Sequence, residues 1–133
     1  MNYPVCEYMQ GDWLLPYRSD IPDRVREVSY QEEPAGIWCV LNFVNNRSTF
    51  TYPDYCTPIP ITPDILEANG FTRYSVVHFN LQQWVLNEGN GCRVSLYQDV
   101  KSGKWAIKDF WIDYIHELQH ILRLCKIEKE IML

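Results

Sequence analysis

The sequence predicts an α+β fold of antiparallel strands, with one short internal helix and one long C-terminal helix packed on the sheet. The first observation is a series of short runs rich in β-branched and aromatic residues, separated by turn residues. The second is a full set of helix start and stop signals at 62–70, and the third is a helical period from about Asp113 to Glu128. Aromatic residues make up 14% of the chain, which also favours a β-rich, tightly packed core.

Four strands are expected in the first part of the chain. One of these runs, Ile-Trp-Cys-Val-Leu-Asn-Phe-Val, is almost continuously apolar, which is typical of a buried strand. The last of the four alternates as a half-buried strand does, and a proline closes the first. Four strands so close together favour a small, strongly bent, SH3-like sheet. They are expected at residues 11–16, 24–30, 37–44 and 48–52.

The signals at 62–70 are local and specific. Thr62 is placed as the N-cap, Pro63 at the first helical position and Gly70 as the left-handed stop, so a two-turn helix is expected. A meander of further strands should follow, with turns at 87–91 and 101–104. Its strands are expected at residues 74–79, 83–86, 92–97 and 105–107.

The C-terminal helix is predicted from one apolar stripe. Its members recur at steps of three or four residues, and Asp113 is placed as the N-cap. The stripe consists of Ile115, Leu118, Leu122 and Cys125.

Length and charge limit the class of protein. The 133 residues match a single domain, with two possible sub-modules at 1–57 and 58–133. Twelve Lys and Arg against seventeen Asp and Glu give a net charge of −5, which argues against a protein that binds nucleic acid through its phosphates. About four in five of the tryptophans are expected to lie in the core.

The cysteines and the N-terminal residues predict a compartment. The five cysteines form no CxxC pair, and Cys39 and Cys125 lie in apolar runs as buried free thiols should. The segment Met1–Glu7 has neither the basic nor the apolar region of a signal peptide, and no run approaches the roughly 18 apolar residues of a membrane span. A cytoplasmic protein without a membrane segment is therefore expected.

One pentapeptide points to catalysis. His116-Glu117-Leu118-Gln119-His120 is an HExxH sequence, in which two histidines four residues apart share a helix face and can bind one Zn²⁺. The glutamate between them would then act as general base toward the water bound to the metal. The sequence thus offers His116 and His120 as metal ligands and Glu117 as a catalytic residue.

Three considerations weaken this zinc hypothesis. A catalytic zinc needs a third protein ligand, which would have to come from upstream, for example His78, Asp99 or Asp109. The two histidines fall on the polar face of the predicted helix, where they are expected to be exposed to water. The chain is also small for a protease that must build a substrate cleft. The preferred interpretation is therefore a structural pair of histidines with no catalytic residue, no metal and no cofactor.

Short segments along the chain resemble a known group of proteins. Residues 59–62 (Ile-Pro-Ile-Thr), with Leu66 and Gly70-Phe71 after them, resemble the "IPLT…L…GF" segment of small uncharacterised proteins of gut Bacteroidetes and their prophages. Residues 114–120 resemble the "YVHQLQNL" helix of the same proteins, and 11–13 resemble their "IGNW/Y" strand. The resemblance implies a phage or mobile-element context, and it carries over no catalytic residue.

The resemblance also bears on the zinc hypothesis. That group has Gln at the position of Glu117 and Asn at the position of His120. On this comparison, the HExxH sequence is a local departure from an ordinary packed helix.

We therefore expect a non-enzymatic cytoplasmic domain that binds another macromolecule, with a protein as the expected partner and neither nucleic acid nor membrane. The alternative is a small zinc-dependent hydrolase that uses His116, Glu117 and His120. The sequence does not indicate an oligomeric state.

Overall fold

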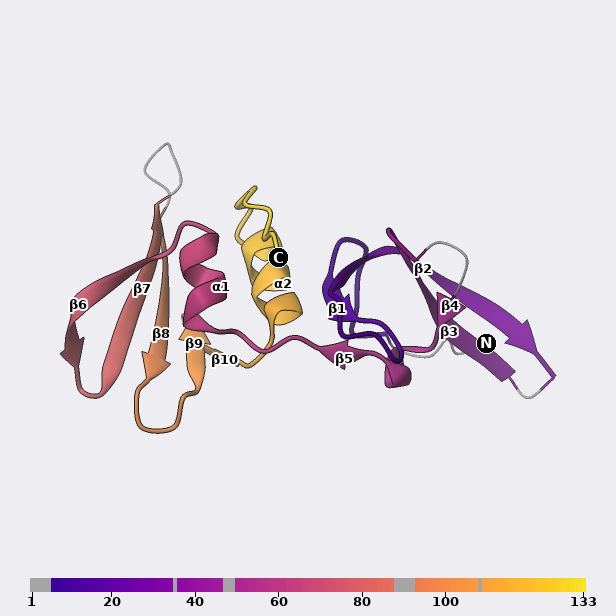
Figure 1. Ribbon diagram of the computed structural model, residues 1–133, viewed down its shortest axis with the longest axis horizontal. Coiled ribbons are helices and arrows are strands. Elements are labelled where there is room, and N and C mark those ends of the chain that lie inside the picture. Colours follow the sequence, from indigo (N-terminus) through magenta and orange to yellow (C-terminus); the bar gives the residue numbers. More distant parts are fainter. Residues whose placement is uncertain (1–5, 35, 47–49, 88–92, 108) are drawn as a thin grey trace. The chain divides into compact units, whose positions relative to one another are not determined.

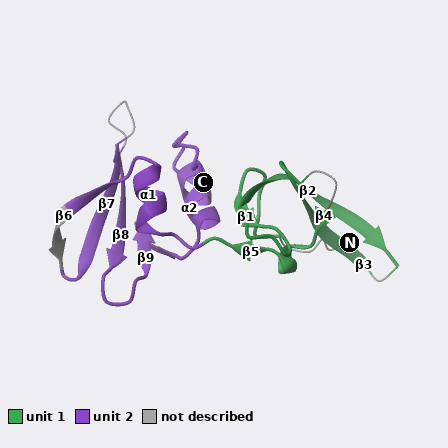
Figure 2. Ribbon diagram, viewed as in Figure 1, with its two compact units in different colours: residues 1–59 green, residues 60–133 purple. Residues whose placement is uncertain are grey.

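The structure is a computed structural model that describes residues 6–34, 36–46, 50–87, 93–107 and 109–133, and only the backbone at 75–78. It contains two antiparallel five-stranded sheets and two α-helices, the second of them near the C-terminus, which confirms the predicted α+β class. The chain divides into two compact units, Met1–Ile59 and Pro60–Leu133, each with its own sheet (Figure 2). This division lies two residues beyond the predicted sub-module boundary. Among the described residues, no helix is long and apolar enough to cross a membrane.

Unit 1 is built around two long strands that form a hairpin. The strand order is β4-β3-β2-β1-β5, and all the pairs are antiparallel. A short 3-10 helix, η1, separates β4 from β5. The four predicted strands are present, whereas η1 and the two-residue β5 were not predicted. The elements are β1 (Trp13–Leu15), β2 (Asp23–Glu33), β3 (Gly36–Phe43), β4 (Phe50–Thr51), η1 (Pro53–Tyr55) and β5 (Thr57–Pro58) (Figure 1).

Strand β2 is long enough to pair with both of its neighbours. Its first residues pair with β1, and it pairs with β3 from Val25 opposite Phe43 to Glu33 opposite Gly36. The register shifts between Val25 and Glu27, and such a bulge bends a strand. The core of unit 1 forms on one side of these strands and consists of Tyr8, Leu14, Val25, Leu41, Phe43 and Cys56.

A buried carboxylate holds the beginning of β2 to the turn after β3. Asp23 is buried, and its Oδ1 accepts hydrogen bonds from the backbone N–H groups of Arg24 at 2.8 Å and Asn45 at 3.1 Å. Its Oδ2 accepts from the N–H of Asn46 at 3.1 Å. One side chain thus satisfies three backbone donors from two segments of the chain.

Unit 2 is a meander with two helices against its sheet (Figure 1). The strand order is β10-β9-β8-β7-β6, so each strand pairs with the next one along the chain. The meander was predicted, apart from its last strand, β10. The predicted turn at 87–91 lies largely outside the described residues. The elements are α1 (Pro63–Ala68), β6 (Thr72–His78), β7 (Leu81–Asn87), β8 (Arg93–Asp99), β9 (Trp105–Ile107), β10 (Phe110–Ile112) and α2 (Ile115–Leu124).

Helix α1 has the predicted start and stop. The side chain of Thr62 accepts from the N–H of Ile65 at 3.3 Å, Pro63 occupies the first turn, and Gly70 has a φ of 89°. The buried amide of Asn69 then ties the helix to a distant segment: its Nδ2 donates to the carbonyl of Met132 at 2.9 Å, and its Oδ1 accepts from the Met132 N–H at 2.7 Å.

Helix α2 is shorter than the predicted span from Asp113 to Glu128. It ends because Lys126 adopts a left-handed φ of 58° and the N–H of Ile127 bonds to the carbonyl of Leu122 at 2.9 Å, as in a Schellman motif. Of the predicted stripe, Ile115, Leu118 and Leu122 are buried. Cys125 is only half-buried, so its predicted burial was wrong, while that of Cys39 is confirmed.

The tryptophans depart from expectation. Three of the five, Trp13, Trp84 and Trp105, are buried. Trp38 and Trp111 are 45% and 64% exposed, so fewer tryptophans lie in the core than predicted. Exposed tryptophans matter for function because they are unfavourable in water and common at binding sites.

Candidate functional site

The HExxH residues lie in the first turns of α2. Because the helix begins at Ile115, His116 and Glu117 are its second and third residues. The carboxylate Oε1 of Glu117 accepts the backbone N–H groups of Asp113 at 3.0 Å and Tyr114 at 3.1 Å. A glutamate at the third helical position commonly caps a helix in this way. The helix N-cap is Tyr114 and not Asp113 as predicted, because the Glu117 side chain folds back over the end of the helix.

The histidines do not form the water-exposed pair that was predicted. His116 is only 2% exposed, and its ring stacks on Tyr114 with centroids 5.8 Å apart and planes 13° apart. His120 is half-buried, with its ring edge-on to His116 at a centroid distance of 5.6 Å. The polar stripe of α2 is therefore partly buried, because aromatic stacking at the start of the helix covers a position that the helical period assigns to water.

The upstream donors that could supply a third metal ligand were predicted to include His78 and Asp99. Within the described part of the chain, no group of three or more His, Cys, Asp or Glu side chains could hold a metal ion. The side chain of His78 lies outside the described residues. Asp99 is used in the turn after β8, where the backbone N–H groups of Lys101 and Ser102 bond to its carboxylate and lower its pKa.

Substitution of Glu117 tests its role as a helix cap. We expect Glu117→Ala to lower the free energy of unfolding by about 1 kcal/mol, because two backbone donors lose their acceptor. Glu117→Gln should keep nearly all of that stability, since an amide oxygen can accept the same bonds. Urea denaturation followed by circular dichroism measures both variants. A capping role is contradicted if the glutamine variant loses as much stability as the alanine variant.

A second candidate site lies on unit 1, where five aromatic side chains form a continuous surface. We call it the aromatic strip. Four of its rings are between 45% and 58% exposed, and that of Tyr52 is half-buried. They come from the segment after β1, from β3, from β4 and from η1 with the residue before it. The aromatic strip consists of Tyr17, Trp38, Phe50, Tyr52 and Tyr55.

Each ring of the aromatic strip contacts at least one other ring of the strip. Tyr52 lies edge-on to Trp38 at a centroid distance of 6.1 Å and edge-on to Tyr55 at 6.0 Å. Tyr55 in turn lies 5.3 Å from Tyr17, and Phe50 meets Tyr52 at 6.4 Å. Edge-on contacts between aromatic rings are favourable, so the rings of the strip stabilise one another.

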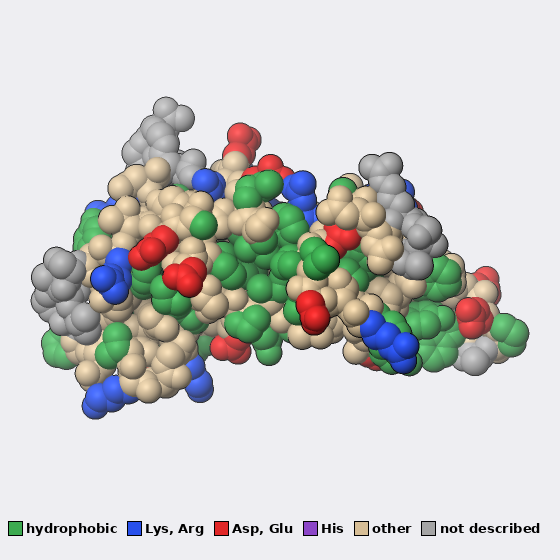
Figure 3. Space-filling model, in the orientation of Figure 1, with side chains coloured by type: hydrophobic (Ala, Val, Ile, Leu, Met, Phe, Trp, Pro, Cys, Tyr) green, Lys and Arg blue, Asp and Glu red, His purple; other side chains and the backbone are tan. Residues whose placement is uncertain are grey.

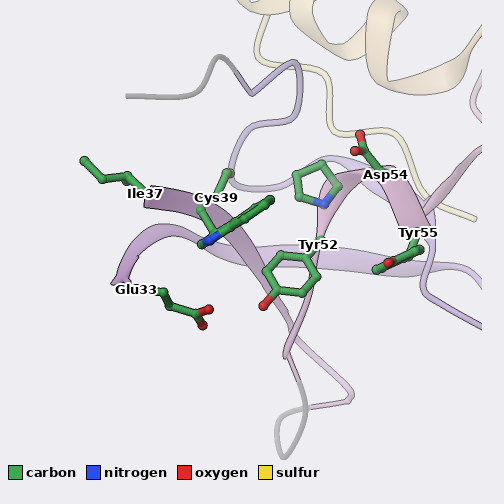
Figure 4. Close-up of a pocket in the computed structure, with 8 residues that line it drawn as sticks. Glu33, Ile37, Cys39, Tyr52, Asp54 and Tyr55 are labelled. Carbon is green, nitrogen blue, oxygen red and sulfur yellow. The ribbon is translucent and has the colours of Figure 1, made fainter. Parts of the chain in front are cut away.

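Three residues of the aromatic strip line a groove of about 540 Å³. Trp38, Tyr52 and Tyr55 form its apolar wall, and two acidic residues, Glu33 and Asp54, also line it (Figure 4). Hydrophobic and acidic side chains lie over the β2–β3 end of unit 1, with Lys or Arg side chains beside the hydrophobic ones (Figure 3). The groove thus combines a large apolar contact area with negative charge.

Cys39 lines the same groove, but its thiol is a poor nucleophile. It is buried, and this burial, reinforced by the neighbouring Cys6 thiol, raises the pKa of Cys39 to about 12. Its thiol therefore stays protonated at neutral pH, and a protonated thiol is a poor nucleophile. The groove is suited to binding by contact area and charge.

The sequence did not identify this site. Trp38 lies in an apolar run that predicts a buried strand. Tyr52 and Tyr55 lie in a turn segment that contains no catalytic motif. Comparison of the chain with protein-family models, with curated proteins and with solved structures gives no match.

Proposed function

We propose that the protein is a non-enzymatic binding module whose unit 1 holds an extended, proline-containing segment of another protein in the groove. The observation that carries this proposal is the exposed aromatic strip. Large apolar side chains gathered in one exposed patch are unfavourable in water and mark interaction sites in soluble proteins. Tyrosine and tryptophan are also the residues most enriched where proteins contact each other.

The spacing of the rings favours an extended ligand. Neighbouring centroids from Trp38 through Tyr52 and Tyr55 to Tyr17 are 5.3 to 6.1 Å apart. A polyproline II helix has three residues per turn and rises about 3.1 Å per residue, so residues on one face recur about every 9 Å, and such a segment lying along the row passes over several rings. Proline-rich segments lose little entropy on binding because they already have this conformation, and aromatic grooves bind them for that reason.

The topology of unit 1 supports the same function. We propose that it is an SH3-like barrel, because the order β5-β1-β2-β3-β4, a bulged second strand and a 3-10 helix before the last strand suit such a fold. Small barrels of this kind host many activities, so the fold only supports the proposal that the aromatic strip carries.

Nucleic acid suits this groove less well than protein does. Aromatic rings can stack on bases, but Glu33 and Asp54 would repel the phosphates beside them.

We place the module in the cytoplasm, which the unbridged thiols of Cys6, Cys39 and Cys56 support. A phage or mobile-element context, as in the proteins that the sequence resembles, is part of the same proposal.

Substitution of Trp38 tests the proposed function. We expect Trp38→Ala to weaken binding of a neutral peptide of six prolines flanked by glutamines about tenfold or more, because a central exposed ring of the groove is removed. Titration of the ¹⁵N-labelled protein, followed by NMR, measures the affinity and shows which residues shift. The unfolding free energy should change by less than about 1 kcal/mol, since the side chain is exposed.

Trp111→Ala is the matched control. Trp111 is also exposed but lies in β10 of unit 2, so its loss should leave peptide affinity unchanged. The proposal is wrong if Trp38→Ala and Trp111→Ala bind the peptide equally, or if the shifted resonances lie away from the aromatic strip.

A further inference from the structure

We infer that unit 2 has a binding site of its own, for a neutral sugar, at the end of its meander. The site is a groove of about 610 Å³, within the range of about 300–1,000 Å³ that is usual for small-molecule sites. All of its lining residues belong to unit 2, so the inference does not depend on the function proposed for unit 1. They are Asp99, Ser102, Lys104, Trp111 and Asp113.

The register of the sheet forms a polar row in this groove. Strand β9 lies between β8 and β10. Asp99 ends β8, and its backbone N–H donates to the carbonyl of Lys104, the residue before β9, at 2.9 Å. On the other side, Ile112 ends β10 and pairs with Trp105, so the next residue, Asp113, comes opposite Lys104. One ammonium group thus stands between two carboxylates at the ends of three strands.

Trp111 lies on the same face of the sheet as the polar row. It precedes Asp113 by two residues, and side chains two residues apart in a strand share a face. Its partner in β9 is Ala106, which places only a methyl group beside the indole. The Trp111 side chain is 64% exposed, whereas tryptophan is mostly buried in folded proteins. The indole therefore offers a flat apolar surface beside the charged groups.

A pyranose ring matches this combination of groups. The C–H groups on one side of the sugar can lie against the negative face of the Trp111 indole. The sugar hydroxyls can donate to the carboxylates of Asp99 and Asp113 and accept from the ammonium of Lys104, and hydrogen bonds to charged groups are the stronger kind. The N–H of Lys101 donates to Oδ1 of Asp99 at 2.9 Å and so holds this carboxylate in place.

The charges of the groove favour a neutral sugar over a charged ligand. Two carboxylates repel an acidic sugar, and the ammonium of Lys104 between them repels an organic cation. Because a neutral ligand has no charge for salt to screen, its affinity should change by less than about twofold between about 50 and 500 mM salt.

Titration of the ¹⁵N-labelled protein with three tetrasaccharides, followed by NMR, tests the inference. The probes are cellotetraose, mannotetraose and chitotetraose, at up to about 20 mM because small open sites bind weakly. At least one should shift the indole N–H of Trp111 and the backbone resonances of residues 99–104 and 111–113. Trp111→Ala should weaken its binding about tenfold or more, and Asp113→Ala about threefold or more.

Two neighbouring residues provide matched controls. Phe110 precedes Trp111 in β10 and is 59% exposed, but the alternation of the strand points its side chain to the other face. Asp109 is an exposed carboxylate that does not line the groove. Phe110→Ala and Asp109→Ala should therefore keep the wild-type affinity for the sugar.

Three outcomes would overturn the inference. In the first, none of the tetrasaccharides shifts the groove resonances. In the second, Phe110→Ala weakens binding as much as Trp111→Ala does. In the third, tetramethylammonium binds more tightly than every sugar and loses affinity with salt, which would make the groove a cation site. Trp38→Ala should leave sugar affinity unchanged, so this inference and the proposed function can fail separately.

Discussion

Trp84→Ala is expected to lower the free energy of unfolding by about 4 kcal/mol, the largest effect among the substitutions considered. Trp84 lies in β7, is 1% exposed and packs against Trp105 with ring centroids 6.3 Å apart. Removing its indole leaves a cavity under the meander that the short strand β9 cannot close, and Trp105 loses its aromatic partner. Urea denaturation followed by far-UV circular dichroism measures the loss.

Trp84→Phe is the informative companion to that variant. The indole Nε1 of Trp84 is buried and has no hydrogen-bond partner in the described part of the chain. Phenylalanine removes this unsatisfied donor and keeps an aromatic ring, so the gain offsets part of the smaller cavity and the net cost should be about 1 kcal/mol. The packing explanation is refuted if the phenylalanine and alanine variants are equally destabilised.

Asp23→Ala should cost about 3 kcal/mol, the second largest effect. The carboxylate of Asp23 accepts the backbone N–H groups of Arg24, Asn45 and Asn46, and it is itself buried. Alanine leaves these three donors without their acceptor, and hydrogen bonds to a charged group are the stronger kind. Denaturation gives the total cost, and hydrogen exchange should show faster exchange at Asn45 and Asn46.

Asp20→Ala is the control for that experiment. Asp20 is an exposed carboxylate three residues earlier, so its loss should change stability by no more than about 0.5 kcal/mol. Equal effects of the two alanine substitutions would show that net charge, and not the anchored turn, explains the loss at Asp23.

The parts of the fold that could be predicted from the sequence are those that depend on residues close together in the chain. Thr62, Pro63 and Gly70 fix both ends of α1 within nine residues, and the structure has those ends. The turn between β6 and β7 was misplaced because it consists of Phe79 and Asn80, both with positive φ. Asn80 lies in the predicted connection between these strands, but a phenylalanine rarely adopts a positive φ, so the sequence does not indicate that the turn begins at Phe79.

The missed elements and sites depend on contacts between distant residues. The three residues of β10 are a strand because they pair with β9, and a run that short has no period of its own. Trp38 stands in an apolar run, and only the placement of Tyr52 beside it shows that its ring belongs to an exposed surface. Likewise, the helical period places His116 toward water, whereas stacking on Tyr114 accompanies its burial.

The position of Glu117 has a consequence for motif searches in general. Helix stability favours glutamate at the third helical position whatever the protein does, so capping alone can account for the glutamate of an HExxH sequence in a first turn. In that place the carboxylate bonds to the backbone, as Glu117 does. The number of residues between a motif and the start of its helix is thus a physical filter that can be applied before any metal is sought.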